Sequence, residues 1–320
     1  MTLELYLQNS NDGTIFDITD IAQEITVSQD IEGNAGKLTC TLQKDPNNIL
    51  KIANGSPISF VVNGNGIFYG YIFTIGTDDK QNYEITAYDQ MRYLKNSDVY
   101  TTSDMTSSQI FEKICIDYGL QYFVKVPNMY IPEGYVHDNK TLYAIIERGM
   151  KLANIYEGKQ YFIVDRFGTL IWSELEAEKT DIILGAGSMV TSYNYDRSID
   201  DDTYNQIKLY RDNDDSGKRD IWLVKDSDNQ KRWGILQLLQ KADDDANAEQ
   251  IRNTAENYLK IKNRETETLK LTGEGILSLT AGRGARIIIE TEGIDKYMWI
   301  KNSTHKFTKY SHTMELEVEV

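Results

Sequence analysis

The chain has 320 residues, of which 40% are hydrophobic, so it is long enough to form two or three domains with real cores. Its formal net charge of −15 argues against binding to nucleic-acid phosphates or to anionic lipid, since both require a basic surface. The 21 tyrosines and only 4 prolines favour ordered β-structure over disorder.

The first 90 residues predict a series of short strands. The amino terminus has no basic segment followed by an apolar one, so we expect no secretion signal. Residues 3–7 and 38–42 alternate apolar with polar side chains, which is typical of strands with one buried face. Asn63-Gly64 lies between two apolar runs and is a strong signal for a β-hairpin. Six or seven strands at this spacing predict a small barrel or sandwich.

Helices are expected next. Thr106 and its two following serines can cap a helix with an apolar stripe that stops at Gly119. A second helix is expected from Leu142 to Gly158, and it is followed by a hairpin over 161–172. The sequence therefore predicts a mixed α+β block in the middle of the chain.

Strands return from about residue 185, and one of them is expected over 234–239. One helix should interrupt them at about 244–260, because Asp243–Asp245 and later lysines complement its dipole. The last eight residues, 313–320, alternate strictly between apolar and polar side chains. They predict a strand with one buried face.

Two cysteines, Cys40 and Cys115, lie among apolar neighbours with no metal-binding spacing. We therefore expect buried, reduced thiols, which fits folding in a bacterial cytoplasm. No apolar stretch is long enough to predict a membrane span.

The sequence offers little for catalysis or for metal and cofactor binding. His137, His305 and His312 accompany no nucleophile motif, and a surface or packing role is favoured for the last two. Residues 212–217 resemble the start of a calcium loop, but the twelfth position is Leu223, where a glutamate is needed. No phosphate-binding glycine motif is present. We predict no enzyme, no cofactor and no metal, although paired carboxylates keep a cell-wall hydrolase as an alternative.

Four segments in order give the chain a resemblance that covers nearly its whole length. They are 87–96 (AYDQMRYLKN), 138–146 (DNKTLYAII), 158–170 with its DRFGTL sequence, and 192–200 (SYNYDRSID). In this order they resemble the XkdQ/YqbQ family, the baseplate hub proteins of contractile phage tails and phage-tail-like bacteriocins. A later stretch, 271–287, fits the family's late barrel turn and strand.

The resemblance implies a mainly β fold with an α+β insertion, similar to the T4 baseplate hub and the amino-terminal part of type VI spike proteins. Two small tail-tube-like β-barrels, over 1–95 and 185–320, would flank a mixed domain over 96–184. The long helix would belong to the second barrel.

The resemblance also implies a structural function. Three copies would form a pseudo-six-fold ring that adapts a six-fold tail tube to a three-fold central spike. The implied partners are the tail tube protein, the spike, the tape-measure protein and wedge or LysM-type hub-associated proteins. The chain would be made in the bacterial cytoplasm and assembled into a baseplate.

Within such a ring, acidic side chains could line the lumen and keep DNA or a tape-measure protein sliding. The residues with this expectation are Asp200, Asp201, Asp202, Asp214 and Asp215. A glycan- or receptor-binding module is the other alternative, because tyrosine and tryptophan are abundant, although aromatic side chains also fill β-cores.

Overall fold

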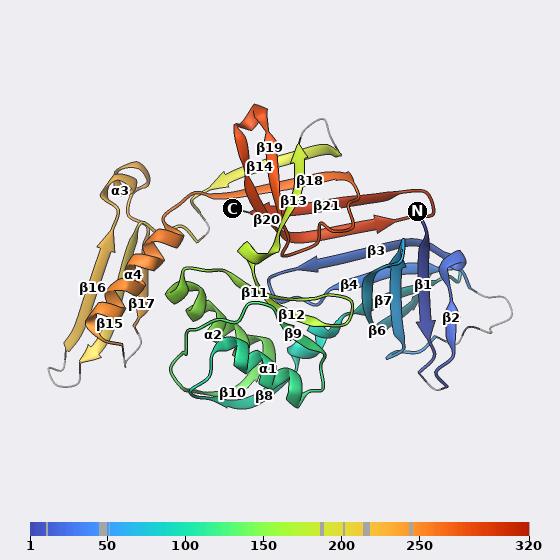
Figure 1. The fold of residues 1–320 in the computed structure, drawn as a ribbon, viewed down its shortest axis with the longest axis horizontal. Coiled ribbons are helices and arrows are strands. Elements are labelled where there is room, and N and C mark those ends of the chain that lie inside the picture. The colour runs from blue at the N-terminus through green and yellow to red at the C-terminus, as the bar shows by residue number, and fades with distance from the viewer. Residues whose placement is uncertain are drawn as a thin grey trace.

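A computed structural model gives the fold of this chain (Figure 1). It describes residues 1–10, 12–44, 50, 52–185, 189–200, 202–213, 218–242 and 246–319. The strands and helices form one large sheet, three small sheets and several helices that cover them.

Seven antiparallel strands open the chain. Alternate side chains such as Leu5, Leu7 and Phe60 are fully buried in a first hydrophobic core, as the period of two predicts. The hairpin predicted at Asn63-Gly64 is confirmed, because both residues have positive φ (49° and 77°) between β5 and β6. The elements are β1 (Leu3–Gln8), β2 (Ile15–Asp17), β3 (Ala22–Asp30), β4 (Lys37–Leu42), β5 (Pro57–Val62), β6 (Asn65–Thr77), β7 (Tyr83–Tyr88) and the 3-10 helices η1 (Thr19–Ile21) and η2 (Gln90–Lys95).

The middle segment forms a second core between helices and short sheets. Both predicted helices are confirmed: α1 has a capping box at Thr106, and α2 ends at Gly158 in the left-handed conformation. The buried Trp172 of the predicted hairpin packs in this core. The elements are β8 (Ser97–Thr102), α1 (Ser107–Asp117), β9 (Tyr122–Val124), β10 (Tyr135–Thr141), α2 (Leu142–Glu157), β11 (Tyr161–Asp165), β12 (Leu170–Glu174) and η3 (Leu175–Glu178).

The C-terminal strands form a third core. The terminal alternation is confirmed in its described part, since Met314, Leu316 and Val318 are each at most 2% exposed, while Val320 lies outside the described residues. Strand β21 pairs with β18 on one side and with β20 on the other. The elements are β13 (Lys179–Gly185), β14 (Val190–Ser198), β18 (Thr266–Glu274), β19 (Gly284–Ile289), η4 (Glu290–Glu292), β20 (Ile294–Phe307) and β21 (His312–Glu319).

One pairing joins the two ends of the chain. Strand β20 lies antiparallel to β3, with His305 opposite Val27, and so fuses the first and last strands into one thirteen-stranded sheet. Its main path runs β14-β18-β21-β20-β3-β4-β7-β6-β5-β1-β2. The mainly β prediction is therefore confirmed, but the described strands of the single chain contain no closed barrel.

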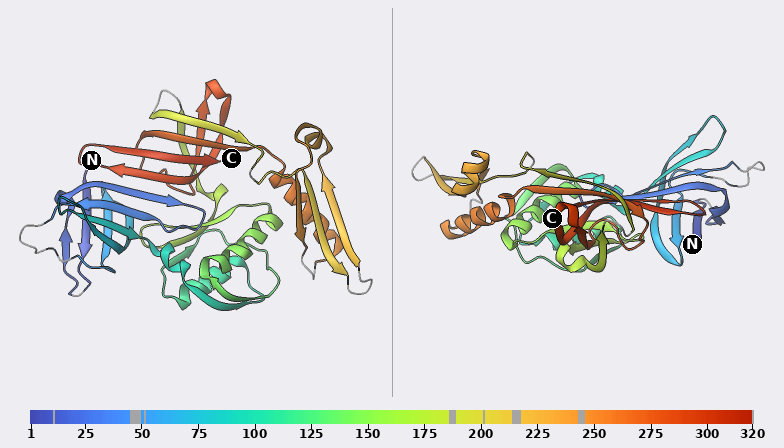
Figure 2. Two further views of the ribbon diagram at one scale, coloured as in Figure 1. Left: turned by 180° about the vertical axis from the view of Figure 1, so that it is seen from behind. Right: turned by 90° about the horizontal axis from the view of Figure 1, so that it is seen from above.

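A further unit, which we call the side lobe, projects from one end of the molecule (Figures 1 and 2). Helix α4 packs on one face of a three-stranded sheet and buries Ile207, Leu209 and Ile251. The lobe consists of β15 (Gln206–Asn213), β16 (Lys218–Lys225), α3 (Ser227–Trp233), β17 (Gln237–Lys241) and α4 (Ala248–Lys262).

The side lobe corrects two predictions. The helix expected at about 244–260 begins at Ala248, because Asn247 and Gln250 form a capping box, and Asp243–Asp245 lie outside the described residues. The strand expected over 234–239 begins only at Gln237. The strand starts late because helix α3, which was not predicted, occupies residues up to Trp233 and ends at Gly234, whose φ is 77°.

Both cysteines are buried and unpaired, as expected. Burial raises the pKa of each thiol to about 12. Among the described residues, no helix is long and apolar enough to cross a membrane.

Candidate functional site

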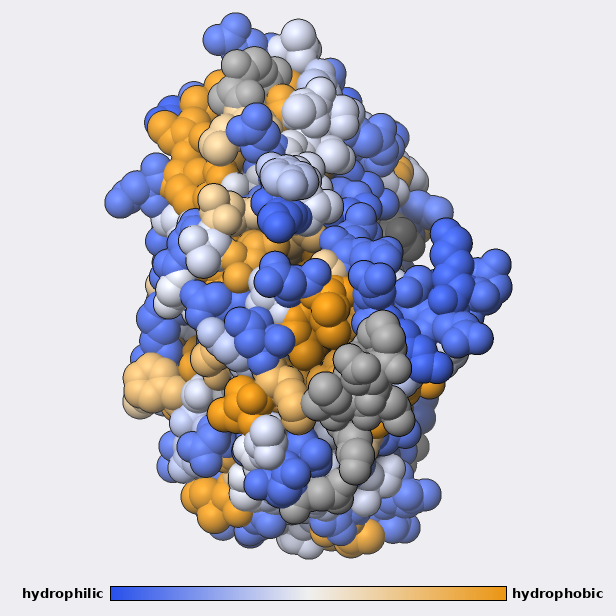
Figure 3. Space-filling model, turned by 90° about the vertical axis from the view of Figure 1, so that its right-hand side faces the viewer, coloured by the Kyte–Doolittle hydropathy of each residue, from blue (hydrophilic) through white to orange (hydrophobic). Residues whose placement is uncertain are grey.

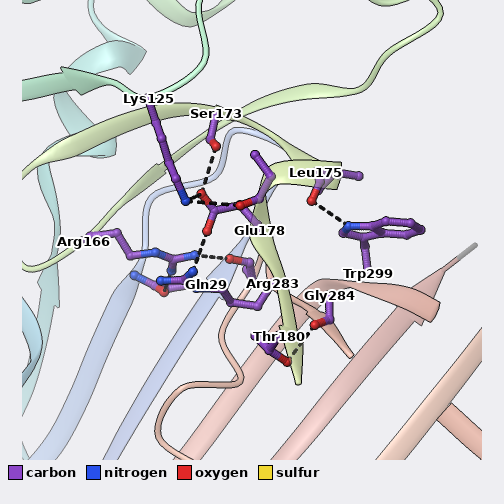
Figure 4. Close-up of polar contacts among 12 residues, drawn as sticks. Gln29, Lys125, Arg166, Ser173, Leu175, Glu178, Thr180, Arg283, Gly284 and Trp299 are labelled. Carbon is purple, nitrogen blue, oxygen red and sulfur yellow. Dashed lines mark hydrogen bonds and ion pairs between the residues drawn. The ribbon is translucent and has the colours of Figure 1, made fainter. Parts of the chain in front are cut away.

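The three cores meet at a set of hydrogen-bonded polar side chains, which we call the joint. Figure 4 shows its central part, where side chains from the N-terminal sheet, the middle segment and the turn before β19 converge. The members of the joint are Gln29, Asp89, Gln90, Lys125, Asp165, Arg166, Ser173, Glu178 and Arg283.

The tip of the β11–β12 hairpin makes the first set of contacts in the joint. Phe167 and Gly168 have φ of 50° and 82°, and the Gly168 amide donates to Asp165 Oδ1 at 2.7 Å. This turn places the Phe167 ring edge-on to Tyr69, with the ring centroids 6.0 Å apart. A Cβ at Gly66 would overlap the Phe167 ring, so the glycine in β6 leaves room for the tip.

Arg166, at the same tip, makes hydrogen bonds to the N-terminal sheet and to the turn before β19. Its Nη2 donates to the carbonyl oxygen of Ala281 at 2.6 Å, and its Nη1 donates to Gln29 Oε1 at 3.3 Å. Gln29 in turn donates to the Asp165 carbonyl at 3.0 Å. Burial, together with the neighbouring charge of Arg283, lowers the pKa of Arg166 to about 10. One side chain thus ties the middle segment to β3 and to the turn before β19.

Asp89 and Gln90 form the N-terminal side of the joint, directly after β7. Asp89 caps η2 through the amide of Met91 at 3.0 Å and accepts from the Gly36 amide at 3.0 Å. Gln90 donates to the Gly168 carbonyl, and its own side-chain oxygen accepts from the Gln121 amide at 3.2 Å. Gln90 therefore bonds the end of the N-terminal sheet both to the hairpin tip and to the segment before β9.

Two of the three carboxyl groups of the joint, Asp89 and Asp165, have raised pKa values. Asp89 and Asp165 are each 1% exposed. Burial and the charge of Asp165 raise the pKa of Asp89 well above its usual range. Burial raises the pKa of Asp165 to about 6, against hydrogen bonds from Gly168 and Gln90 that lower it. The pair carries less than two full negative charges near neutral pH.

Glu178, at the end of η3, forms the third contact. Its carboxylate is 4% exposed and accepts from Lys125 Nζ at 2.6 Å, Ser173 Oγ at 2.9 Å and Arg283 Nη1 at 2.6 Å. Burial alone would raise the pKa of Glu178, but these hydrogen bonds and the two cations bring it below its ordinary value. The carboxylate stays charged and links the middle segment to the C-terminal strands.

Two neutral hydrogen bonds support this link. The Trp299 indole donates to the Leu175 carbonyl at 2.8 Å, and Thr180 Oγ1 donates to the Gly284 carbonyl at 2.8 Å. Figure 4 shows both beside Glu178. Satisfied buried networks of this kind stiffen an interface and fix its geometry. The chemistry of the joint is that of a rigid connection.

His305 and His312 have a packing role, which is one of the two roles expected for them. His305 is 3% exposed, its Nδ1 lies 2.9 Å from His312 Nε2, and its Nε2 lies 2.9 Å from the Leu279 carbonyl. The His312 ring stacks on Phe307 with centroids 4.1 Å apart. Within the part of the chain that the structure describes, no three His, Cys, Asp or Glu side chains are grouped to hold a metal.

The two acidic candidates that the structure describes, Asp200 and Asp202, lie apart from the joint, between β14 and the side lobe. Asp200 is exposed after β14. Asp202 has φ of 57° and its carboxylate accepts from Lys262 Nζ, so a basic partner already offsets part of its charge. Asp201, Asp214 and Asp215 lie outside the described residues.

The joint itself was missed as a site. Its signal was nevertheless present, because the segments that carry the family resemblance include Asp89 and Gln90 in 87–96 and Asp165 and Arg166 in 158–170. Nothing in the sequence says that these two segments touch, since Gln90 and Asp165 are 75 residues apart.

Solved structures define the class of fold. A 43 kDa tail protein of prophage MuSo2 from Shewanella oneidensis matches with a TM-score of 0.72 and 16% identity over 98% of both chains. The E. coli protein c3393, a type VI secretion component similar in structure to the T4 tail proteins gp27 and gp5, matches with a TM-score of 0.59 and 11% identity. This match covers 99% of our chain and 76% of that one. The fold is therefore that of these tail proteins.

The family follows from the sequence comparisons. The phage-like element PBSX protein XkdQ of Bacillus subtilis is 28% identical over 271 residues, which are 83% of this chain and 82% of that protein. Residues 25–319 match the model of the YQBQ-like family, and the chain belongs to that family. The predicted XkdQ/YqbQ relationship is thus confirmed.

Proposed function

We propose that this chain is a structural hub protein in the baseplate of a contractile phage tail or tail-like particle. The observation that carries the proposal is the likeness to a prophage tail protein along 98% of both chains, together with membership of the YQBQ-like family. The similarity of c3393 to the T4 proteins gp27 and gp5 favours a position at the tail tip.

The proposed architecture uses the two ends of the large sheet as tube-like units. Most of the first core comes from residues 1–95, most of the second from 96–184 and most of the third from 185–320. Three copies would contribute six such units to a pseudo-six-fold ring, with neighbouring copies completing the barrel walls. A rigid joint fits this role, because the two units of each copy must keep one relative orientation for the ring to close.

This ring would adapt a six-fold tail tube to a three-fold central spike. The proposed partners are the tail tube protein, the spike, the tape-measure protein and wedge or LysM-type hub-associated proteins. Asp200, Asp201, Asp202, Asp214 and Asp215 are proposed to face the lumen, where negative charge would repel DNA. Replacing Asp200 is a better test of the lumen role than replacing Asp202, because Asp202 is paired with Lys262.

Native mass spectrometry tests the assembly state. A trimer of about 110 kDa, three times the 36.7 kDa chain, is expected. A species that stays at 36.7 kDa up to high micromolar concentration would argue against the ring. Zymography on bacterial cell walls tests the non-catalytic assignment, for which no cleared zone is expected. A cleared zone that is still produced by the purified chain would instead identify the protein as a cell-wall hydrolase.

A further inference from the structure

A large cleft separates the side lobe from the middle segment, and we call it the side cleft. Its volume is about 850 Å³. Helix α2 forms one wall with Leu152 and Ile155, and the side lobe forms the other with Leu238 and Ile261. The middle of the cleft is therefore apolar, and it lies toward the left end of the molecule in Figure 1.

Cations surround this apolar floor. The lining includes five basic and two acidic side chains in a chain whose formal net charge is −15. Lys151 pairs with Glu147 one helical turn away, but its side chain is 66% exposed, so that pair adds little and can exchange for another. The basic residues are Arg148, Lys151, Lys159, Lys241 and Lys262, and the acidic ones are Glu133 and Asp202. An acidic, partly apolar segment complements such a surface.

The opposite end of the molecule has these properties. Residues 1–21 contain four Asp and Glu side chains and no Lys or Arg. Strand β2 ends the path of the large sheet, and its Ile15 is 65% exposed. Asp12 and Asp20 are exposed on either side of this strand. Figure 3 looks onto this end, where hydrophobic side chains lie exposed among hydrophilic ones. A sheet edge with an exposed aliphatic side chain is a surface that a partner covers.

We propose that the β2 edge of one copy docks into the side cleft of a second copy of this chain. Ile15 would contact the apolar floor, and the flanking aspartates would approach the basic rim. The edge and the cleft lie at opposite ends of the longest axis in both Figures 1 and 2, so the contact is head-to-tail. Head-to-tail contacts close into a ring when the rotation between copies permits. This inference rests on the proposed hub function and names the surface that closes its ring.

Charge reversal on each side tests the contact, with analytical ultracentrifugation of the full chain as the readout. The cleft variant is Arg148→Glu with Lys151→Glu, and the edge variant is Asp12→Lys with Asp20→Lys. Each is expected to weaken trimer formation at least about tenfold. The matched control is Lys113→Glu with Lys231→Glu. These are two exposed helical lysines outside the cleft that also pair with nearby aspartates, and they should leave the trimer unchanged.

The variant carrying all four reversals separates docking from misfolding. Its edge carries two lysines in place of Asp12 and Asp20, and its cleft carries two carboxylates in place of Arg148 and Lys151. The exchanged charges attract again, so the trimer is expected to return. A cross-link provides the positional test: Ile15→Cys combined with Lys151→Cys should join two chains through a bis-maleimide. The native Cys40 and Cys115 are buried and should not compete.

The outcomes distinguish this inference from the function on which it rests. If wild type and both reversed variants are equally trimeric, or if the four-reversal variant stays dissociated, the docking contact is wrong and the ring forms through another surface. Loss of the trimer in the control as well would overturn the specific contact. A wild type that never associates removes the proposed ring, and the docking contact with it.

Discussion

The Arg283 guanidinium donates a 2.6 Å hydrogen bond to the buried carboxylate of Glu178, across 105 residues of sequence. This contact makes Glu178 one of the points at which the middle segment is fixed to the C-terminal strands, and Lys125 binds the same carboxylate from within the middle segment. Replacing Glu178 with Ala would leave both cations without this partner. Because both cations are partly exposed, we expect a loss of about 3 kcal/mol in the free energy of unfolding, measured by urea denaturation.

Glu315→Ala is the matched control for that variant. Its ion pair with Lys306 is exposed on both sides, so a change below about 1 kcal/mol is expected. Equal losses for the two variants would show that the burial of Glu178 has no special effect.

The Asp89–Asp165 pair predicts an unusual dependence on pH. Folding raises both pKa values, that of Asp165 to about 6, so the folded state holds protons that the unfolded state releases. The stability that the protonated Asp165 contributes is therefore fully present below about pH 4, and it is lost as the pH rises through about 6. We expect Asp165→Asn to gain up to about 2–3 kcal/mol relative to wild type between pH 4.5 and 7.5. Urea unfolding at several pH values measures this, and parallel curves for the two proteins would contradict it.

Gly36 is expected to tolerate no side chain. A Cβ at this position would overlap the Asp89 carboxylate oxygen that the Gly36 amide binds. Gly36→Ala should therefore lose about 1–3 kcal/mol of stability through overpacking at the joint. Gly76→Ala is the control, because its nearest neighbour is the movable end of Glu84 at 3.2 Å. Similar thermal midpoints for both variants would argue against a tightly packed joint.

The cysteines predict the result of a labelling experiment. Burial raises the pKa of Cys40 and Cys115 to about 12, and each thiol packs inside a hydrophobic core. A thiol reagent at pH 8 should therefore label neither residue in the native protein and both in urea. Rapid labelling of either cysteine under native conditions would show that its core opens readily.

Local patterns predicted the local structure well. The alternation of Met314, Leu316 and Val318 sufficed for β21, and the caps at Thr106 and Gly158 sufficed for two helices. These features depend on neighbours within a few residues, where sequence spacing fixes geometry.

The joint and the β3–β20 pairing could not be predicted in this way. Gln29 and the Asp165 carbonyl are 136 residues apart, and neither residue carries a pattern that specifies the other. The helix α3 was missed for a different reason: its seven residues, Ser227–Trp233, bury no side chain, so they show no apolar stripe. The segments that carry the family resemblance include residues of the joint, but the resemblance does not say which of these residues contact one another.

The central claim is that three copies of this chain form a ring with pseudo-six-fold walls. Electron microscopy of the purified, associated chain tests it most directly through class averages computed without imposed symmetry. The account predicts a ring with three-fold symmetry, six similar wall units and an open lumen. Averages showing isolated monomers, two-fold dimers or open filaments would contradict it.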